Sequence, residues 1–273
     1  MLQLAPDTWE SIICSAWDAV RDRVETKRDL EFAHEHTLQF HFAWEVARMV
    51  QFSDNLQVRF EIRSIAPEPR GVIQTDLMFW TNPDFRIAVE VKAPIRSESG
   101  ANSAMTHGRM AFYKDIDRLR YLVEDPTSNR LLKKSDSCFD RLSTNGKSPT
   151  ILSPPPFALS LSKGERRIFQ HPAKVQRGVF LAVVNEIGYV AHGQQWKNLE
   201  YRTFQETHVE ARTVIAATSG RNGCLYPLEM PCHPIEWIWE CENKNGRVVP
   251  RAGFRHFWLK PIAILPREGD MEA

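Results

Sequence analysis

The spacing of apolar residues predicts two helices at the start of the chain. Between residues 8 and 28 the apolar positions recur every three or four residues, as they do along one face of a helix. A second, longer helix is expected from Leu30 to Val50. Three runs with strand character follow over residues 56–65, 72–80 and 86–92, and the turns between them contain proline or glycine.

Two further elements decide the fold class. A helix is predicted from Gly108 to Val123, and the uninterrupted apolar run from Gly178 to Val184 is typical of a strand buried on both faces. The order of elements is therefore helix, three strands, helix and strand. This order predicts an α/β domain with a central mixed β-sheet flanked by helices.

The stretch between these last two elements differs in composition from the rest. Residues 125–172 are rich in Ser, Pro, Lys and Asn and show no sustained periodicity, which predicts a long flexible insertion. Residues 1–124 and 173–273 would then form a single domain. Residues 136–168 resemble a translated bacterial repetitive palindromic element and would carry no catalytic residue, so we expect deletion of residues 135–170 to leave activity intact.

The C-terminal third is predicted to contain one helix, residues 199–211, and then strands. The strand candidates cover residues 214–217, 235–241 and 255–262, and Asn245-Gly246 is typical of a hairpin turn. Aromatic side chains in these runs could stack on bases, but their alternation along the strands favours core packing. The residues concerned are Trp237, Trp239 and Trp258.

Composition adds three expectations. The 35 Lys and Arg residues nearly balance the 34 Asp and Glu residues, so no global basic field marks a protein permanently bound to nucleic acid. The five cysteines contain no CxxC pair and fit no iron–sulfur spacing, which indicates reduced thiols. No apolar run approaches the ~20 residues of a membrane span, and no leader sequence is recognisable, so we expect no membrane contact and a cytoplasmic location.

Two carboxylates are expected to face one another between the second and third predicted strands. If that hairpin is centred on Pro83, Asp76 lies opposite Glu90, and Lys92 points to the same face because strand side chains alternate. Opposed carboxylates repel one another, whereas a divalent cation between them, Mg²⁺ or Mn²⁺, would be coordinated by hard oxygen ligands. An ammonium group beside such a cation can orient water and neutralise charge on a phosphate. These residues therefore predict a metal site that cuts a phosphodiester bond.

The second predicted helix offers a further carboxylate. A step of about 100° per residue places Glu31 and Glu35 on the same face as Leu38 and Phe42. A carboxylate on an apolar helix face needs a partner, and a metal site would provide one. Glu35 is the favoured ligand, Glu31 remains open, and a solvated first turn is the alternative for both.

The order and spacing of these elements resemble the PD-(D/E)XK, or restriction-endonuclease-like, nuclease superfamily. The resemblance covers roughly residues 30–123 and the strand near Phe180. Thr75 stands where the family name has proline, a departure that is frequent in the family. The resemblance implies a restriction-endonuclease-like core interrupted by the long insertion.

The resemblance also implies roles for individual residues. Asp76, Glu90 and the backbone carbonyl of Val91 would hold one or two Mg²⁺ ions. Glu35 would be an auxiliary metal ligand, and Lys92 would help to activate the attacking water. The implied activity is metal-dependent hydrolysis of phosphodiester bonds, with DNA as the expected substrate and water as the nucleophile.

The helix that follows the site carries basic residues. Arg109, Lys114 and Arg118 are candidates for phosphate contacts. The alternative is a solvated face on which Asp115 and Asp117 pair with these basic groups at helical spacing.

Two other functions stay open at this point. The chain could be a catalytically silent domain of the same fold that binds nucleic acid or a partner protein. It could also be an unrelated α/β protein in which Glu90 and Lys92 form a structural ion pair. A homodimer would suit double-strand cutting, but no heptad or interface stripe in the sequence demonstrates one.

Overall fold

The structure is a computed structural model that describes residues 6–31, 34–50, 56–65, 70–82, 85–95, 105–124, 175–191, 201–219 and 225–267. Its helices are α1 (Pro6–Asp22), the π-helical turn η1 (Arg23–Lys27), α2 (Glu35–Met49), α3 (Met105–Glu124) and the short 3-10 helix η2 (Ile187–Tyr189). Its strands are β1 (Gln57–Ile65), β2 (Val72–Asn82), β3 (Phe85–Lys92), β4 (Arg177–Val184), β5 (Thr207–Val209), β6 (Val214–Ser219), β7 (Leu225–Glu229), β8 (Ile235–Trp237), β9 (Cys241–Lys244), β10 (Arg247–Pro250), β11 (Phe257–Trp258) and β12 (Ile262–Ile264).

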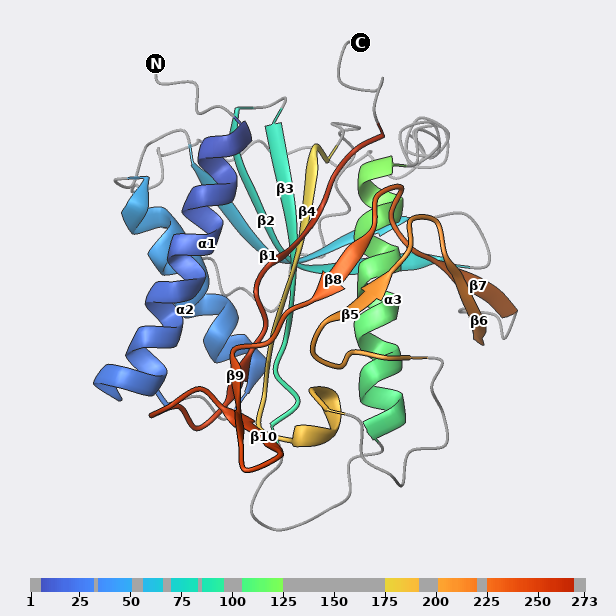
Figure 1. The fold of residues 1–273 in the computed structure, drawn as a ribbon. Helices are drawn as coiled ribbons and strands as arrows, with labels where there is room; N and C mark the ends of the chain where they lie inside the picture. Colours follow the sequence, from blue (N-terminus) through green and yellow to red (C-terminus); the bar gives the residue numbers. More distant parts are fainter. Residues whose placement is uncertain are drawn as a thin grey trace, which may run out of the picture.

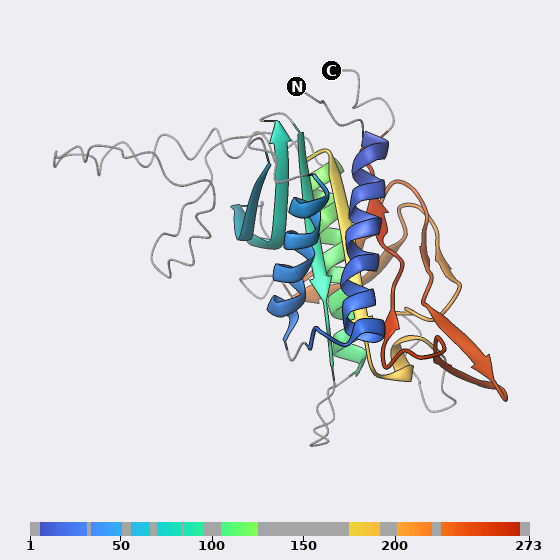
Figure 2. The ribbon, with the colours of Figure 1, turned by 90° about the vertical axis from the view of Figure 1, so that its left-hand side faces the viewer.

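A mixed sheet lies between two layers of helix, as the sequence predicts. In the described part of the chain, six strands form this sheet in the order β1-β2-β3-β4-β11, with β12 also paired to β4. The pairs β1–β2 and β2–β3 are antiparallel, and β3–β4 is parallel. Helices α1 and α2 cover one face of the sheet and α3 covers the other (Figure 1). Turned by 90°, the molecule shows α1 and α2 in front of the sheet and α3 behind it (Figure 2).

The alternation of side chains along β3 explains how two cores form on one sheet. Ile87, Val89 and Val91 pack with α1 and α2, while Ala88 packs with α3 on the opposite face. Every residue of β4 is buried, which confirms the expectation of a strand covered on both faces. Glu90 and Lys92 belong to the face that looks toward α3, and this places them between sheet and helix.

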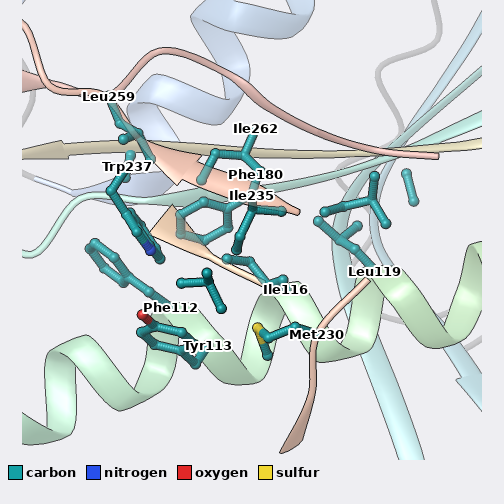
Figure 3. Close-up of a cluster of buried hydrophobic side chains, with 14 of the residues drawn as sticks. Phe112, Tyr113, Ile116, Leu119, Phe180, Met230, Ile235, Trp237, Leu259 and Ile262 are labelled. Carbon is teal, nitrogen blue, oxygen red and sulfur yellow. The ribbon is translucent and has the colours of Figure 1, made fainter. Parts of the chain in front are cut away.

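Aromatic packing fixes α3 against the sheet. Phe112 lies 5.3 Å from Phe180 and 6.0 Å from Trp237 between ring centroids, and Ile116 and Leu119 continue the same face of α3 (Figure 3). A fully buried large apolar side chain stabilises the fold by about 1.5–3 kcal/mol, so these contacts hold the helix firmly. The interpretation of the tryptophans as core residues is confirmed, since the exposed fraction is at most 2% for each of Trp237, Trp239 and Trp258.

A buried carboxylate ties the start of the chain to its end. Glu25 in η1 accepts hydrogen bonds from the backbone N–H of Arg255 (2.6 Å) and from Trp258 Nε1 (2.8 Å). His256 Nδ1 lies 2.6 Å from the same carboxylate. Burial would raise the pKa of Glu25, but these hydrogen bonds outweigh burial and lower the pKa below its ordinary value.

The β2–β3 hairpin has the predicted register. Leu77 pairs with Val89 and Phe79 with Ile87, as a hairpin centred on Pro83 requires. Within the described residues the ladder pairs begin at Leu77, so Asp76 is not paired to Glu90 through the backbone. Across β1, the pairing skips Asp76 as well, because Glu61 opposite it adopts a left-handed conformation with φ 51°. Irregular pairing of this kind releases a side chain from the regular strand geometry.

Two helix predictions are wrong, and two predicted strands are present only in part. The second helix begins at Glu35 rather than Leu30, because Arg28 adopts φ 57° and ends the preceding turn of helix. Residues 199–211 do not form the predicted helix over their described part, which contains strand β5, since Gln205 N–H donates to Val190 O instead of to its own chain segment. The run 235–241 and the run 255–262 are each interrupted.

The interruption of the predicted strand over residues 255–262 has a physical cause. Pro261 separates β11 from β12 and cannot donate to a ladder. The hairpin turn at Asn245-Gly246 is confirmed, with φ 55° and 75°, between the antiparallel strands β9 and β10. The predicted insertion over residues 125–172 lies outside the described residues. Among the residues that are described, no helix is long and apolar enough to cross a membrane.

Candidate active site

Glu90 is a buried carboxylate in the middle of the central sheet. It lies beside Phe180 of β4 in the parallel register, and its exposed fraction is 0%. Neither of its carboxylate oxygens has a hydrogen-bond partner within the part of the chain that the structure describes. Burying a charged group without a partner is costly, and an unsatisfied buried polar group in a native fold points to a missing ion or to a functional role.

Asp76 reaches the same place from β2. Its Oδ2 accepts the backbone N–H of Val91 at 2.8 Å, which turns the Asp76 carboxylate toward the end of β3 next to Glu90. Burial, followed by the charges of Asp115 and Asp76, raises the pKa of Glu90 well above its usual range. The two carboxylates therefore interact unfavourably when no cation lies between them.

Lys92 is held between two helices of opposite layers. Its Nζ lies 3.3 Å from Glu35 Oε1 at the start of α2 and 3.1 Å from Asp115 Oδ2 of α3. Burial would lower the pKa of Lys92, but the carboxylates around it, Asp115 first, raise that pKa above its usual value. Lys92 is thus positively charged and carries its charge at the edge of the Asp76–Glu90 pair.

Glu35 and Glu31 are separated by the start of α2. Glu35 Oε2 also accepts the N–H of Ala93 at 3.3 Å, so the first turn of the helix contacts the end of β3. Burial, together with the charge of Asp76, raises the pKa of Glu35, and the Lys92 ammonium opposes this rise. Glu31 precedes the helix and is exposed. The structure therefore brings Glu35, and not Glu31, to the other candidate residues.

Asp115 is a member of this cluster that the sequence did not single out, since it was considered only as part of a possible solvated face of the helix. Its exposed fraction is 1%, and its Oδ1 accepts a 2.6 Å hydrogen bond from Arg118 Nη1. A signal for it was present, because Asp115 stands three residues after Phe112 and four before Leu119 on the apolar stripe of α3. Like Glu35, Asp115 is a carboxylate on the apolar face of a helix and therefore needs a partner.

The three predicted phosphate-binding residues have different surroundings. Arg118 is tied to Asp115, and its side chain is 37% exposed. Lys114 is half-buried, and burial together with the charge of Arg118 lowers its pKa. Arg109 is 1% exposed, with its guanidinium 5.3 Å from the centroid of the Phe204 ring, so it lies in the core on the α3 side.

The donor set suits a divalent cation in charge and in chemistry. Two basic groups, Lys92 and Arg118, face four carboxylates, which leaves a formal excess of two negative charges. All available donors are hard oxygens, which Mg²⁺ and Mn²⁺ prefer. Over the described ranges, however, no three Asp, Glu, His or Cys side chains converge into a preformed metal cage. The four carboxylates are Glu35, Asp76, Glu90 and Asp115.

The match between cation and residues therefore depends on Glu90. Its buried oxygens have no hydrogen-bond partner among the described residues, whereas Glu35 and Asp115 both contact Lys92. With Asp76 beside it, Glu90 offers the beginning of a coordination shell that a backbone carbonyl and water would complete.

No protein-family model, no curated protein and no solved structure matches this chain.

Proposed function

We propose that this protein is a metal-dependent nuclease that hydrolyses phosphodiester bonds, with DNA as the expected substrate. The observation that carries the proposal is the Glu90 carboxylate, which is fully buried, has no hydrogen-bond partner among the described residues and lies beside Asp76 and Lys92. A structural role would give this carboxylate a partner, as Glu25 has. The restriction-endonuclease-like core remains part of the proposal, supported by the order β2, β3, α3, β4 around the site.

Asp76, Glu90 and the carbonyl of Val91 are the proposed ligands of Mg²⁺ or Mn²⁺. The cation would supply Lewis-acid polarisation of the phosphate and a water molecule of lowered pKa. Asp76 is aligned for this role by the Val91 N–H. Glu35 touches the end of β3 and is the proposed auxiliary ligand.

Lys92 contributes a positive charge at a defined point. Its ammonium is anchored by carboxylates on two sides, so it can donate hydrogen bonds to a phosphate oxygen or to the attacking water without searching for a conformation. The charge of Lys92 is retained at neutral pH because the pKa is raised. This fixed cation stabilises the negative charge that grows on the phosphate during attack.

A catalytically silent domain that binds nucleic acid or a partner protein is the second candidate. One observation favours it: Glu35 and Asp115 both contact Lys92, so within the described cluster Asp76 and Glu90 are the two carboxylates that do not pair with this lysine. Silent binding predicts retention of nucleic acid without cleavage in Mg²⁺ and in Mn²⁺.

Cleavage assays on the full-length protein separate the two candidates. Plasmid, single-stranded DNA and RNA are incubated with Mg²⁺, Mn²⁺ or EDTA. The nuclease proposal expects cleavage that EDTA abolishes and that Asp76→Ala or Lys92→Ala reduces by about 10²–10⁴-fold. Matched controls are Glu210→Gln and Lys27→Ala, whose side chains are 81% and 61% exposed and lie outside the cluster. Cleavage that survives both site substitutions would refute the assignment.

A further inference from the structure

Two acidic residues of α3, two positions apart in the sequence, have entirely different surroundings. Asp117 is bound by Arg70 and Arg120, each at 3.1 Å, and by the backbone N–H of Glu229 at 3.1 Å. It joins α3 to neighbouring parts of the fold. Asp115 instead directs one oxygen to Lys92. The same side-chain type thus serves a structural purpose at one position and faces the candidate site at the other.

Lys92 depends on its partners for a fixed position. A lysine carries its charge at the end of a flexible four-carbon stem, and holding that stem in one geometry costs side-chain entropy. Lys92 is the last residue of β3, so strand β3 does not continue past it and adds no further support to its long side chain. The ammonium is confined by Glu35 on the α2 side and by Asp115 on the α3 side.

Asp115 is the more rigid of these two partners. Its side chain is 2% exposed, against 29% for Glu35, and its second oxygen is held by Arg118 at 2.6 Å. Ion pairs that are buried and tethered are screened less than exposed ones. The helix that carries Asp115 is itself fixed by the aromatic core around Phe112 (Figure 3). Asp115 therefore links the position of the Lys92 ammonium to the rigid core.

We propose that Asp115 is a positioning residue that, with Arg118 as its tether, holds the Lys92 ammonium beside Glu90. In that position the ammonium can act on the phosphate and on the attacking water. This inference rests on the proposed nuclease function and extends it to residues of α3. It also gives Arg118 a role different from a phosphate contact: Arg118 orients Asp115, which orients Lys92.

A double-mutant cycle in the full-length protein tests the inference. Single-turnover cleavage in Mn²⁺ is measured for the wild type, Asp115→Asn, Lys92→Ala and the double variant. We expect Asp115→Asn to lower the rate about 10–100-fold, as loss of a supporting residue does at metal sites, with KM and the Mn²⁺ midpoint changed less than about threefold. In the Lys92→Ala background, Asp115→Asn should cause no further loss, because Asp115 acts through Lys92. Asp115→Glu should recover part of the rate.

Asp117→Asn is the matched control on the same helix. We expect it to lower the urea midpoint without changing KM or kcat in proteins that remain folded, and to combine additively with Lys92→Ala. Additive rate losses for Asp115→Asn and Lys92→Ala would overturn the inference while leaving the nuclease proposal intact. Loss of the Mn²⁺-induced thermal shift in Asp115→Asn would overturn it differently, because Asp115 would then be a metal ligand. A wild type that cleaves nothing would refute the proposed function itself and reduce Asp115 to an ion-pair partner.

Discussion

Replacement of Glu90 by glutamine should stabilise the metal-free protein. Glutamine keeps the shape of glutamate but removes the charge, and the carboxylate of Glu90 is buried without a hydrogen-bond partner among the described residues. The amide N–H groups of glutamine can donate to the neighbouring Asp76 or Asp115 carboxylates, which now repel Glu90. Relief of one unsatisfied buried polar group is worth about 1–3 kcal/mol, or roughly 2–4 °C in Tm for each kcal/mol in a domain near this size.

Divalent metal should reverse the order of stability. A ligand that binds only the folded state stabilises it by RT ln(1 + [L]/Kd), which is about 2.7 kcal/mol at one hundred times Kd. The wild type should therefore gain roughly 5–11 °C in Tm on addition of Mg²⁺ at that ratio. Glu90→Gln should gain much less, because a neutral amide with one oxygen replaces the charged carboxylate ligand. The variant is then the more stable protein in EDTA and the less stable one in Mg²⁺.

Thermal unfolding and urea unfolding in EDTA and in Mg²⁺ measure both halves of this prediction. Glu25→Gln is the control, because Glu25 is an equally buried glutamate with a full set of hydrogen bonds. It should be destabilised under both conditions and keep the metal-induced shift. A Glu90→Gln protein that is less stable than wild type in EDTA, or that retains the whole metal shift, would show that Glu90 is a satisfied structural carboxylate.

Three further predictions concern the fold around the site. Glu25→Gln should lower the free energy of unfolding by about 2–4 kcal/mol, the loss expected when a buried, hydrogen-bonded carboxylate is removed. Because the pKa of Glu25 is lowered on folding, its stabilisation is complete above the ordinary value of 4.5 and is lost as pH falls through the lower folded value. Urea midpoints below pH 4.5 should therefore fall more steeply for wild type than for the variant. Gly108→Ala should destabilise α3 by about 1–3 kcal/mol in thermal unfolding, because the added methyl group overlaps the hydroxyl of Tyr189, which is itself buried. A gain in Tm would mean that Tyr189 moves aside freely. Deletion of residues 135–170 should leave metal-dependent cleavage and Tm nearly unchanged, and a folded but inactive deletion variant would contradict this expectation.

Local patterns were sufficient to predict the sheet that carries the site. The apolar run of β4, the alternation along β3 and the hairpin centred on Pro83 are properties of neighbouring residues, and the structure confirms each of them. The register in turn places Glu90 and Lys92 on one face. The helix predicted over residues 199–211 does not form, because the backbone partners of its described residues lie in other segments, such as Val190 for Gln205. Helical spacing in the sequence does not reveal such partners.

The cluster around Lys92 shows the same division. Its β3 members follow from strand alternation, whereas Asp115 depends on how α3 packs across the sheet. The choice between Glu31 and Glu35 depended on one residue, since the left-handed conformation of Arg28 delays the start of α2. Arg109 shows the opposite case. Its basic side chain suggested a phosphate contact, but the structure buries it beside Phe204.

The parallel pairing of β3 with β4 makes the connection between them tolerant of extra length. The two strands are joined through α3, and 52 residues separate the end of α3 at Glu124 from the start of β4 at Arg177. The entropy cost of closing a flexible loop grows only as (3/2)RT ln n, so 36 residues more or less in a loop of about 50 residues change it by only about 1 kcal/mol. Both ends of the connection are anchored in the core, α3 by its aromatic face and β4 by complete burial. A sequence of arbitrary origin could therefore enter the gene at this point and be carried by the protein at a thermodynamic cost smaller than that of many single substitutions in the core.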